Sequence, residues 1–364
     1  MKSKKIGIMT VGGDCSGLNS VIRAACMRAK IMGHELIGIR RGFFGLFPEN
    51  FDHVSLDTHY CHEGMLTTSG SILYSDTKSF TERLKNGKST EEVLRLACDG
   101  YHKLSLDGLV YIGGDGSLAI LKELLSHHRD LKVVAVPKTI DNDVNITDLS
   151  IGFQTAVEVV SNAVRNIRAT ARSHERTMVI EVMGRDAGFI AIYAGIASGA
   201  DIILVPEFKY NFEMVISKIR EVYASGKDHC IILVAEAVES DDLKHYDEAG
   251  SDAQVCFTVK YKGIGQHIAD RLQKANIDSR AVVLGHTQRG GDTAVLDRIV
   301  GTAFGAEAIN AVSDETYGIM LCYINGRVKR VPISDIMENV HRRLDHSDIC
   351  VKMARDLGVY IGEI

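Results

Sequence analysis

Short apolar runs alternate with amphipathic segments along the first part of the chain. The apolar runs predict strands at 4–9, 34–40, 106–113 and 131–137, and the amphipathic segments predict helices at 18–32 and 117–128. A repeated order of strand, glycine turn and helix predicts a parallel sheet with helices on its faces. Ligands bind such sheets at the carboxyl ends of the strands, so the turns there hold the candidate chemistry.

A second alternating block follows a long amphipathic helix at about 153–172. Strands are predicted at 176–184, 200–207, 228–238 and 279–285, and a helix at 189–197. A further helix at 294–312 is expected to return to the first block. We therefore expect an α/β protein with two Rossmann-like domains, mainly parallel sheets and a cleft between them. The domains are 1–152 plus about 288–364, and 153–287.

Composition narrows the class of protein. The 364 residues are 45% hydrophobic and 24% charged, with a net charge of −5, which is typical of a globular protein and gives no reason to expect nucleic acid. No apolar run is long enough for a membrane span, and the N-terminus lacks the pattern of a signal peptide. The eight cysteines are scattered without a CxxC pair, which favours reduced thiols and a cytoplasmic location.

Two glycine-rich turns are suited to phosphate. Residues 10–19 (TVGGDCSGLN) follow a predicted strand and open a helix, where Gly12 and Gly13 let the backbone approach an anion. Residues 111–120 (YIGGDGSLAI) repeat this design with Asp115 between glycines, a suitable place for Mg²⁺ beside phosphate oxygens. GGDG also occurs in other nucleotide-using kinases, so alone it indicates only a phosphate-donor site. The GKS at 87–89 lacks the glycine of a P-loop and is interpreted as a loop.

The third strand-end turn, 137–143 (PKTIDND), gathers an ammonium, a hydroxyl and two carboxylates. Asp141 is suited to act as a general base, with Thr139 to orient it and Asp143 to fix a metal or the loop. A helix cap would explain one acid but not the whole group behind Lys138.

Basic residues and one acid at further strand ends suit a doubly anionic sugar phosphate. Arg185 follows a buried strand and a glycine, where a guanidinium meets phosphate bidentately. The set comprises Arg176, Arg185, Glu236, Arg280, His286 and Arg289. No nucleophile has a base beside it, which favours direct transfer over a covalent intermediate.

With these motifs in order (GGDCSGLN, GGDGS, PKTIDND, MGRDAG and LGHTQRGG, within about 5–310), the sequence resembles the phosphofructokinase family, in its mixed ATP and pyrophosphate branch. The resemblance implies a 6-phosphofructokinase that transfers the γ-phosphoryl of ATP to the 1-hydroxyl of fructose 6-phosphate, the committed step of glycolysis, with Mg²⁺. The first domain would then bind ATP and Mg²⁺, and the second fructose 6-phosphate. An allosteric homo-oligomer, usually a tetramer with active sites shared between subunits, is implied as well, without an identified effector.

The resemblance also assigns residues. The catalytic group would be Lys138, Thr139, Asp141 and Asp143; the metal position Asp115; and the donor site Gly12, Gly13, Lys78, Gly114, Gly116 and Ser117. The sugar-phosphate site would be Met183, Gly184, Arg185, Glu236, His286 and Arg289, with Arg176 and Arg280 lent by a neighbouring subunit. One segment departs from the family: 69–80 reads SGSILYSDTKSF, where Tyr74 replaces a glycine and Lys78 is the nearest basic residue. A lysine supplies charge there without the planar fork of an arginine.

Two positions bear on the phosphoryl donor. Gly116 leaves space for the α-phosphate of a nucleotide, where pyrophosphate users of the family typically carry aspartate. Lys138 is typical of pyrophosphate users, although some ATP users have it. Steric exclusion at position 116 constrains the donor more strongly than a charge at position 138, so we predict that ATP is the phosphoryl donor.

Alternatives remain at this stage. A pyrophosphate-dependent enzyme, a kinase for a larger ketose phosphate and a non-catalytic sugar-phosphate-binding regulatory paralogue are all compatible with parts of the pattern. A nicotinamide dehydrogenase would need an acid at a strand end about 20 residues past the glycine turn. Glu35 is near that spacing but begins a strand.

Overall fold

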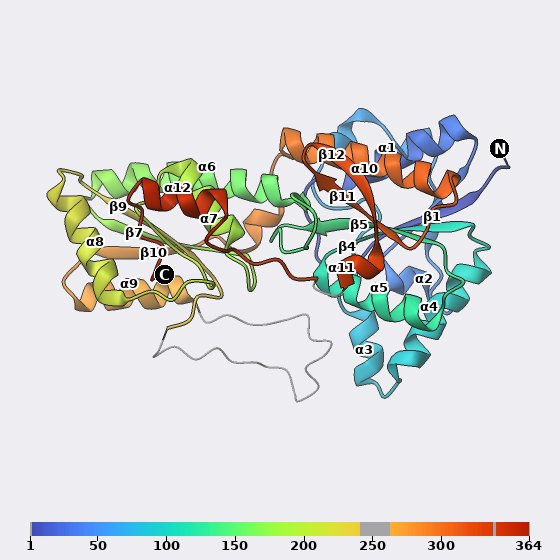
Figure 1. Ribbon diagram of the computed structural model, residues 1–364, viewed down its shortest axis with the longest axis horizontal. Coiled ribbons are helices and arrows are strands. Elements are labelled where there is room, and N and C mark those ends of the chain that lie inside the picture. Colours follow the sequence, from blue (N-terminus) through green and yellow to red (C-terminus); the bar gives the residue numbers. More distant parts are fainter. Residues whose placement is uncertain (1, 241–262, 338–339, 364) are drawn as a thin grey trace.

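In the computed structural model, two α/β units lie side by side along the long axis of the molecule (Figure 1). The structure describes residues 2–240, 263–337 and 340–363. Parallel strands dominate both sheets, so the predicted α/β class with two parallel-sheet units is confirmed. One unit holds the N-terminus, and the described C-terminal residues lie on the other (Figure 1).

The larger sheet has eight strands among the described residues, in the order β12-β11-β5-β4-β1-β2-β3, with β6 paired to β5. Their bounds are β1 Lys5–Thr10, β2 Glu35–Ile39, β3 His53–Ser55, β4 Gly108–Gly113, β5 Val133–Thr139, β6 Ile151–Gly152, β11 Ile319–Ile324 and β12 Arg327–Pro332. β3 and β12 pair antiparallel at the two edges, and the other pairs are parallel.

Helices cover both faces of this sheet. Residues alternate along a strand between its two faces, so Ile8 packs with one group of helices and Met9 with another. The first face carries α1 Leu18–Met32 and α10 Val295–Ser313, and the second carries α4 Thr90–Lys103 and α5 Asp115–His127. The shorter elements are α2 Phe43–Leu46, η1 Thr58–Tyr60, η2 Glu63–Leu66, α3 Ser79–Lys85 and α11 Ile333–Met337.

The smaller sheet has four parallel strands in the described part of the chain, in the order β10-β7-β9-β8. They are β7 Thr177–Val182, β8 Ile202–Leu204, β9 Cys230–Ala235 and β10 Ser279–Val283. Around it lie α6 Phe153–Ser173, α7 Phe189–Ser198, α8 Phe212–Ala224, α9 Ile264–Lys274, η3 Gly285–Arg289 and α12 Ile349–Asp356. β7 and β9 are buried throughout, as expected for central strands covered on both faces.

The C-terminal part of the chain divides between the units. β11 and β12 belong to the larger sheet, and α10 and α11 pack on it. α12 instead lies against α7, and Tyr360 forms a parallel bridge with Ile202 of β8 (Figure 1). The assignment of all of 288–364 to the first domain therefore needs correction at its end. The end of the chain reaches the smaller unit through long-range pairing, which a local sequence pattern does not predict.

The GKS segment lies in the loop before α4, as interpreted from the sequence. Ser89 is the N-cap of α4: its hydroxyl accepts from Glu92 N–H, and the Glu92 carboxylate accepts from Ser89 N–H. This capping box satisfies two backbone donors of the first turn. Lys88 is exposed in front of it, so the segment is a helix start and not a phosphate loop.

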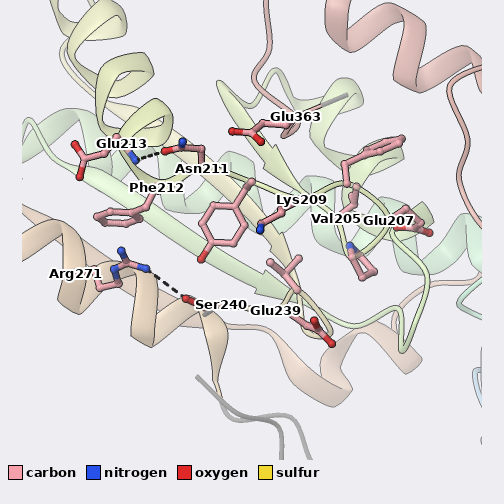
Figure 2. Close-up of a pocket in the computed structure, with 14 residues that line it drawn as sticks. Val205, Glu207, Lys209, Asn211, Phe212, Glu213, Glu239, Ser240, Arg271 and Glu363 are labelled. Atoms are coloured by element: carbon pink, nitrogen blue, oxygen red, sulfur yellow. Dashed lines mark hydrogen bonds between the residues drawn. The ribbon is translucent and has the colours of Figure 1, made fainter. Parts of the chain in front are cut away.

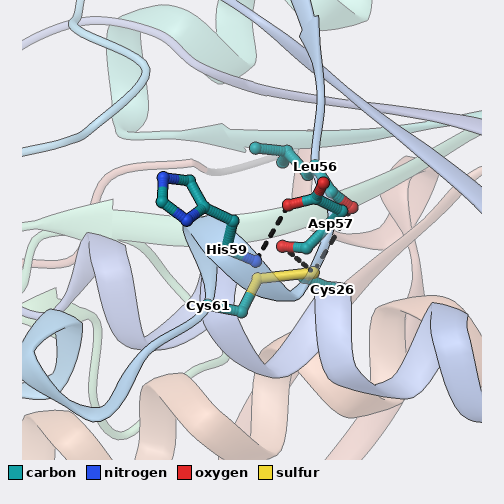
Figure 3. The surroundings of a disulfide bond; sticks show 5 residues. All are labelled: Cys26, Leu56, Asp57, His59 and Cys61. Atoms are coloured by element: carbon teal, nitrogen blue, oxygen red, sulfur yellow. Dashed lines mark hydrogen bonds between the residues drawn. A yellow bond between two sulfur atoms is a disulfide. The ribbon is translucent and has the colours of Figure 1, made fainter.

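The expectation that the thiols are reduced is wrong for one pair. Cys26 of α1 and Cys61 after η1 form a disulfide, beside the backbone of Leu56 and Asp57 (Figure 3). The two residues are 35 positions apart, so spacing alone gave no sign of the pairing. Cys15, Cys98, Cys230, Cys322 and Cys350 are free and buried, while Cys256 lies outside the described residues.

No helix among the described residues has both the length and the apolar character needed to span a bilayer.

Candidate active site

Three strand-end turns of the larger sheet meet at one edge. β1, β4 and β5 are parallel neighbours, with Thr10 opposite Ile112 and Gly113 opposite Pro137. The glycine turn at 11–17, the GGDGS turn and the PKTIDND turn therefore lie next to one another. This is the edge at which doubly wound sheets bind ligands.

The first turn is held in an open, left-handed conformation at Gly12. Its φ is 85°, and a Cβ there would lie 2.7 Å from Ser117 Oγ and 3.3 Å from Lys138 Nζ. A Cβ on Gly13 would lie 2.6 Å from Arg289 Nη1. Only glycine leaves room for these three polar side chains around the turn. The predicted donor residues Gly12, Gly13 and Ser117 are thus brought together.

Asp115 begins α5, directly after the N-cap Gly114. Its side chain is 12% exposed, and a Cβ on Gly114 would lie 2.8 Å from the Lys138 carbonyl oxygen. The close approach of β4 and β5 at this point requires the glycine. Gly116 follows in the first turn, where the helix dipole favours an anion.

The third turn buries Asp141 beside Thr139. The Thr139 hydroxyl accepts from Asp141 N–H at 3.1 Å and lies 3.3 Å from Asp141 Oδ2. Asn142 has a φ of 53° and accepts from Ser150 N–H at 2.9 Å, which holds the turn in a strained conformation. Burial raises the pKa of Asp141, with Asp115 adding to the rise and Arg289 opposing it.

Asp143 completes an acidic group at the end of this turn. Burial, together with the charges of Asp115 and Asp141, raises its pKa well above the ordinary value. Its Oδ1 is buried and has no hydrogen-bond partner among the described residues. One cation between Asp115 and Asp143 would satisfy this oxygen and offset the repulsion.

Lys138 is 3% exposed, and its ammonium donates to Gly13 O at 2.5 Å. Burial lowers its pKa. The side chain therefore spans from β5 to the glycine turn, on the floor of the proposed donor site.

From the smaller sheet, Arg185 reaches across to this edge. It follows β7 and Gly184, has a φ of 51°, and its Nη1 donates to Asp115 Oδ2 at 2.6 Å. Its backbone N–H donates to Glu236 Oε1 at 3.0 Å. Burial, with a smaller contribution from the charge of Asp141, raises the pKa of Glu236 to about 7.

Met183, His286 and Arg289, which were predicted for the sugar-phosphate site, lie after the end of β7 and on η3. Met183 N–H donates to Gln288 Oε1 at 3.2 Å, which ties the end of β7 to η3. η3 also carries the exposed His286 and the half-buried Arg289, whose Nη1 donates to Asp14 O of the glycine turn at 3.0 Å. Arg289 thus spans both sides of the site. Gln288 was not singled out in the sequence, because a glutamine between two candidate residues carries no signal of its own.

Arg176 and Arg280 lie elsewhere. They stand at the starts of β7 and β10, at the opposite end of the strands from Arg185. Both pair with Asp278, at 3.4 and 2.9 Å. Within one chain they are therefore not part of this site.

Segment 69–80, whose sequence departs from the family pattern, runs beside the glycine turn. Asp76 forms a parallel bridge with Val11 and accepts from Gly12 N–H at 3.1 Å, and the Ser75 hydroxyl donates to Gly12 O. Tyr74 has a φ of 57° and is 58% exposed. Lys78 is the N-cap of α3 and is exposed, two residues after Asp76.

The residues present fit a divalent cation. Asp115, Asp143 and His341 each offer a ligand atom, and these atoms lie within 4.8 Å of one another. Sequence reasoning missed His341, since 341 is far from every motif and reaches the site only through tertiary pairing.

A hollow of about 800 Å³ lies elsewhere, on the unit with the smaller sheet (Figure 2). Its described lining runs through 205–213 and 238–240, with Arg271 and Glu363, and includes none of the predicted site residues.

The fold and the site define a class: a two-domain α/β protein whose turns hold buried carboxylates and glycines opposite an arginine from the second domain. The family model "Phosphofructokinase" matches residues 5–312. The chain belongs to the phosphofructokinase family.

Relatives with curated names are similar over their whole length. The "ATP-dependent 6-phosphofructokinase 1" of Nostoc sp. is 41% identical, over 100% of this chain and 99% of its own. The "Pyrophosphate--fructose 6-phosphate 1-phosphotransferase" of Dictyoglomus thermophilum is 37% identical, over 95% and 96%.

Solved structures agree on the fold. Phosphofructokinase from Saccharomyces cerevisiae matches with a TM-score of 0.76 and 27% identity, over 92% of this chain, which spans only 45% of the yeast chain. The pyrophosphate-dependent phosphofructokinase from Nitrosospira multiformis matches with a TM-score of 0.79 and 18% identity, over 100% and 93%.

Proposed function

We propose that this protein is an ATP-dependent 6-phosphofructokinase. It transfers the γ-phosphoryl group of ATP to the 1-hydroxyl of D-fructose 6-phosphate and forms fructose 1,6-bisphosphate. Family membership and the names of relatives near 40% identity support the reaction. The observation that carries it is the position of Asp141: a buried carboxylate, bonded to Thr139, among the donor turns and near Arg185.

In this proposal Asp141 accepts the proton of the sugar hydroxyl as transfer begins, and Thr139 orients its carboxylate. Arg185 and His286 bind the sugar phosphate, and Glu236 accepts sugar hydroxyls. Met183, Gly184 and Arg289 complete this sugar-phosphate site. Arg176 and Arg280 come from a neighbouring subunit of a homotetramer, which agrees with their place outside the site of one chain.

Asp115 and Asp143 would hold Mg²⁺, which supplies charge that offsets the donor phosphates. The unpartnered Asp143 oxygen supports this assignment. On the side away from the metal, the donor phosphates would be lined by Gly12, Gly13, Gly114 and Ser117. Lys78 would supply a positive charge from segment 69–80.

ATP is the proposed donor because Gly116 has no side chain to oppose an α-phosphate. Pyrophosphate is the second candidate, favoured by the buried Lys138 on the donor floor and by the Dictyoglomus relative. A screen of purified protein with ATP, ADP, GTP and pyrophosphate, in a coupled assay for fructose 1,6-bisphosphate, separates the two. Turnover with pyrophosphate alone would overturn the ATP assignment. Binding of sugar phosphate without turnover on any donor would favour a regulatory paralogue.

We also propose that the enzyme works in the cytoplasm, where ATP and sugar phosphates are available. Fractionation of intact cells, with the protein followed by immunoblot, tests this location.

A further inference from the structure

Residues 340–344 lie between α11 and α12, in the part of the chain that crosses from one unit to the other (Figure 1). On the larger unit they pair with the end of the catalytic turn: His341 forms an antiparallel bridge with Val144. Arg342 N–H donates to Asp143 O at 2.7 Å, and Asn145 N–H donates to Val340 O at 2.9 Å. The segment is therefore attached directly behind the acidic group.

The same segment is anchored to the smaller unit. The Arg342 guanidinium lies 4.8 Å from the centre of the Phe189 ring, and Leu344 N–H donates to Glu207 Oε1 at 3.2 Å. On the larger unit, Arg342 Nη1 lies 3.3 Å from Asp148 O, so this side chain contacts both units. These contacts hold the Arg342 side chain in place and so fix the position of its neighbour, His341.

His341 faces the proposed metal position. Its Nδ1 lies 3.6 Å from Asp115 Oδ2, its side chain is 61% exposed, and its Nε2 has no partner among the described residues. A small cavity of about 90 Å³ adjoins it, lined by Asp143, Asp186, Ala187, His341, Arg342 and Arg343. An imidazole thus stands at the open side of the carboxylate pair.

The chemistry of these groups selects the ligand. Mg²⁺ prefers oxygen ligands over imidazole, so His341 is better suited to donate a hydrogen bond than to bind this metal. A phosphoryl donor bound at Asp115 would bring a phosphate oxygen that can accept this hydrogen bond. His341 also lies beyond the region matched by the family model, which ends at 312, so the family match assigns it no role.

We propose that residues 340–344 line the active site, in addition to the strand-end turns of the larger sheet and Arg185 of the smaller unit. We propose that the His341 imidazole binds a phosphate oxygen of the metal-bound phosphoryl donor. This deepens the proposed function and rests on it for the identity of the donor. The segment makes the donor site depend on the C-terminal part of the chain.

Binding of Mg·ADP, measured by calorimetry on the full-length protein, tests the proposal without turnover. We expect His341→Ala to raise the Kd for Mg·ADP by roughly tenfold, the effect of losing one hydrogen bond to a charged group. His341→Gln, which keeps a donor, should recover part of the affinity. The matched control is His127→Ala, which removes another exposed histidine paired with a carboxylate, at the far end of α5. Its Kd should stay at the wild-type value.

The KM for fructose 6-phosphate distinguishes a donor contact from a wall that only holds the units together. It should stay within about twofold in His341→Ala. A Kd for Mg·ADP equal to wild type, or equal losses for both ligands, would overturn the inference. Failure of wild type in the donor screen would instead reject the proposed function, while the Mg·ADP titration would still decide the role of His341.

Discussion

The Arg185 guanidinium donates a 2.6 Å hydrogen bond to the Asp115 carboxylate, joining the second unit to the proposed metal position. The arginine supplies a positive charge at the carboxylate on which a metal would bind. When sugar phosphate is bound, the proposed role of Arg185 requires it to face that phosphate. In the proposed function, the same side chain would pair with Asp115 in the ligand-free protein and bind the sugar phosphate in the complex.

Replacing Arg185 by Ala should act oppositely on two ligands. The KM for fructose 6-phosphate should rise at least tenfold, because a charge-assisted contact is lost. Affinity of the sugar-free enzyme for Mn²⁺, measured by electron paramagnetic resonance, should increase several-fold, because no guanidinium competes for Asp115. Arg330→Ala, which removes an arginine paired with Glu307 and Asp314 on β12, is the control. Weaker Mn²⁺ binding in Arg185→Ala would contradict the competition.

Loss of the proposed base should remove chemistry more than binding. Asp141→Ser should lower kcat by at least ~10²-fold with a small change in KM, since a general base contributes about that much. Because burial raises the pKa of Asp141, the fall in wild-type rate at low pH should begin above the ordinary range near pH 4. The base is active when deprotonated, so the rate drops as pH falls through that pKa. A kcat loss below tenfold would reject the role of Asp141.

The donor assignment makes a separate prediction at Gly116. Asp in place of Gly adds bulk and negative charge where the α-phosphate of ATP would lie, in the first turn of α5. Gly116→Asp should lower kcat/KM for ATP by at least ~10²-fold and affect pyrophosphate much less. Steady-state kinetics with each donor measures the ratio. Equal losses on both donors would show that the substitution only damages the site.

Glu236 predicts a pH dependence of stability in the ligand-free protein. Its pKa in the folded state is about 7, above the ordinary 4.5, so folding favours the protonated form. Its contribution is present below about pH 4.5 and is lost as pH rises through 7, by roughly 3 kcal/mol in total. Glu236→Gln should lose less stability than wild type between pH 5 and 8 in urea unfolding. Glu221→Gln, at an exposed glutamate, should follow wild type; a Glu236→Gln curve parallel to wild type would contradict the assignment.

The strand-end chemistry was readable from the sequence because it is local. Gly12, Asp115 and Asp141 each follow an apolar run, and parallel strands bring such positions to one edge. Arg185 was placed by the same logic in the second unit. The features that sequence reasoning missed depend on contacts between distant segments.

Two cases show the limit. Cys26 and Cys61 pair because η1 returns to α1, which spacing does not reveal. His341 reaches Asp115 only through the bridge to Val144, across nearly the whole chain.

The amino-acid sequence by itself determined the two-unit parallel architecture, the turns that meet at its edge and the family of the protein. These follow from periodicity and from residue types at fixed spacing, which act over one strand and one turn. Only the tertiary structure decided that Arg185 bonds to Asp115, that Lys138 lies on the glycine turn and that His341 lies beside Asp115. Such contacts arise from the packing of whole elements, and no local pattern encodes which distant side chain will fill a given space.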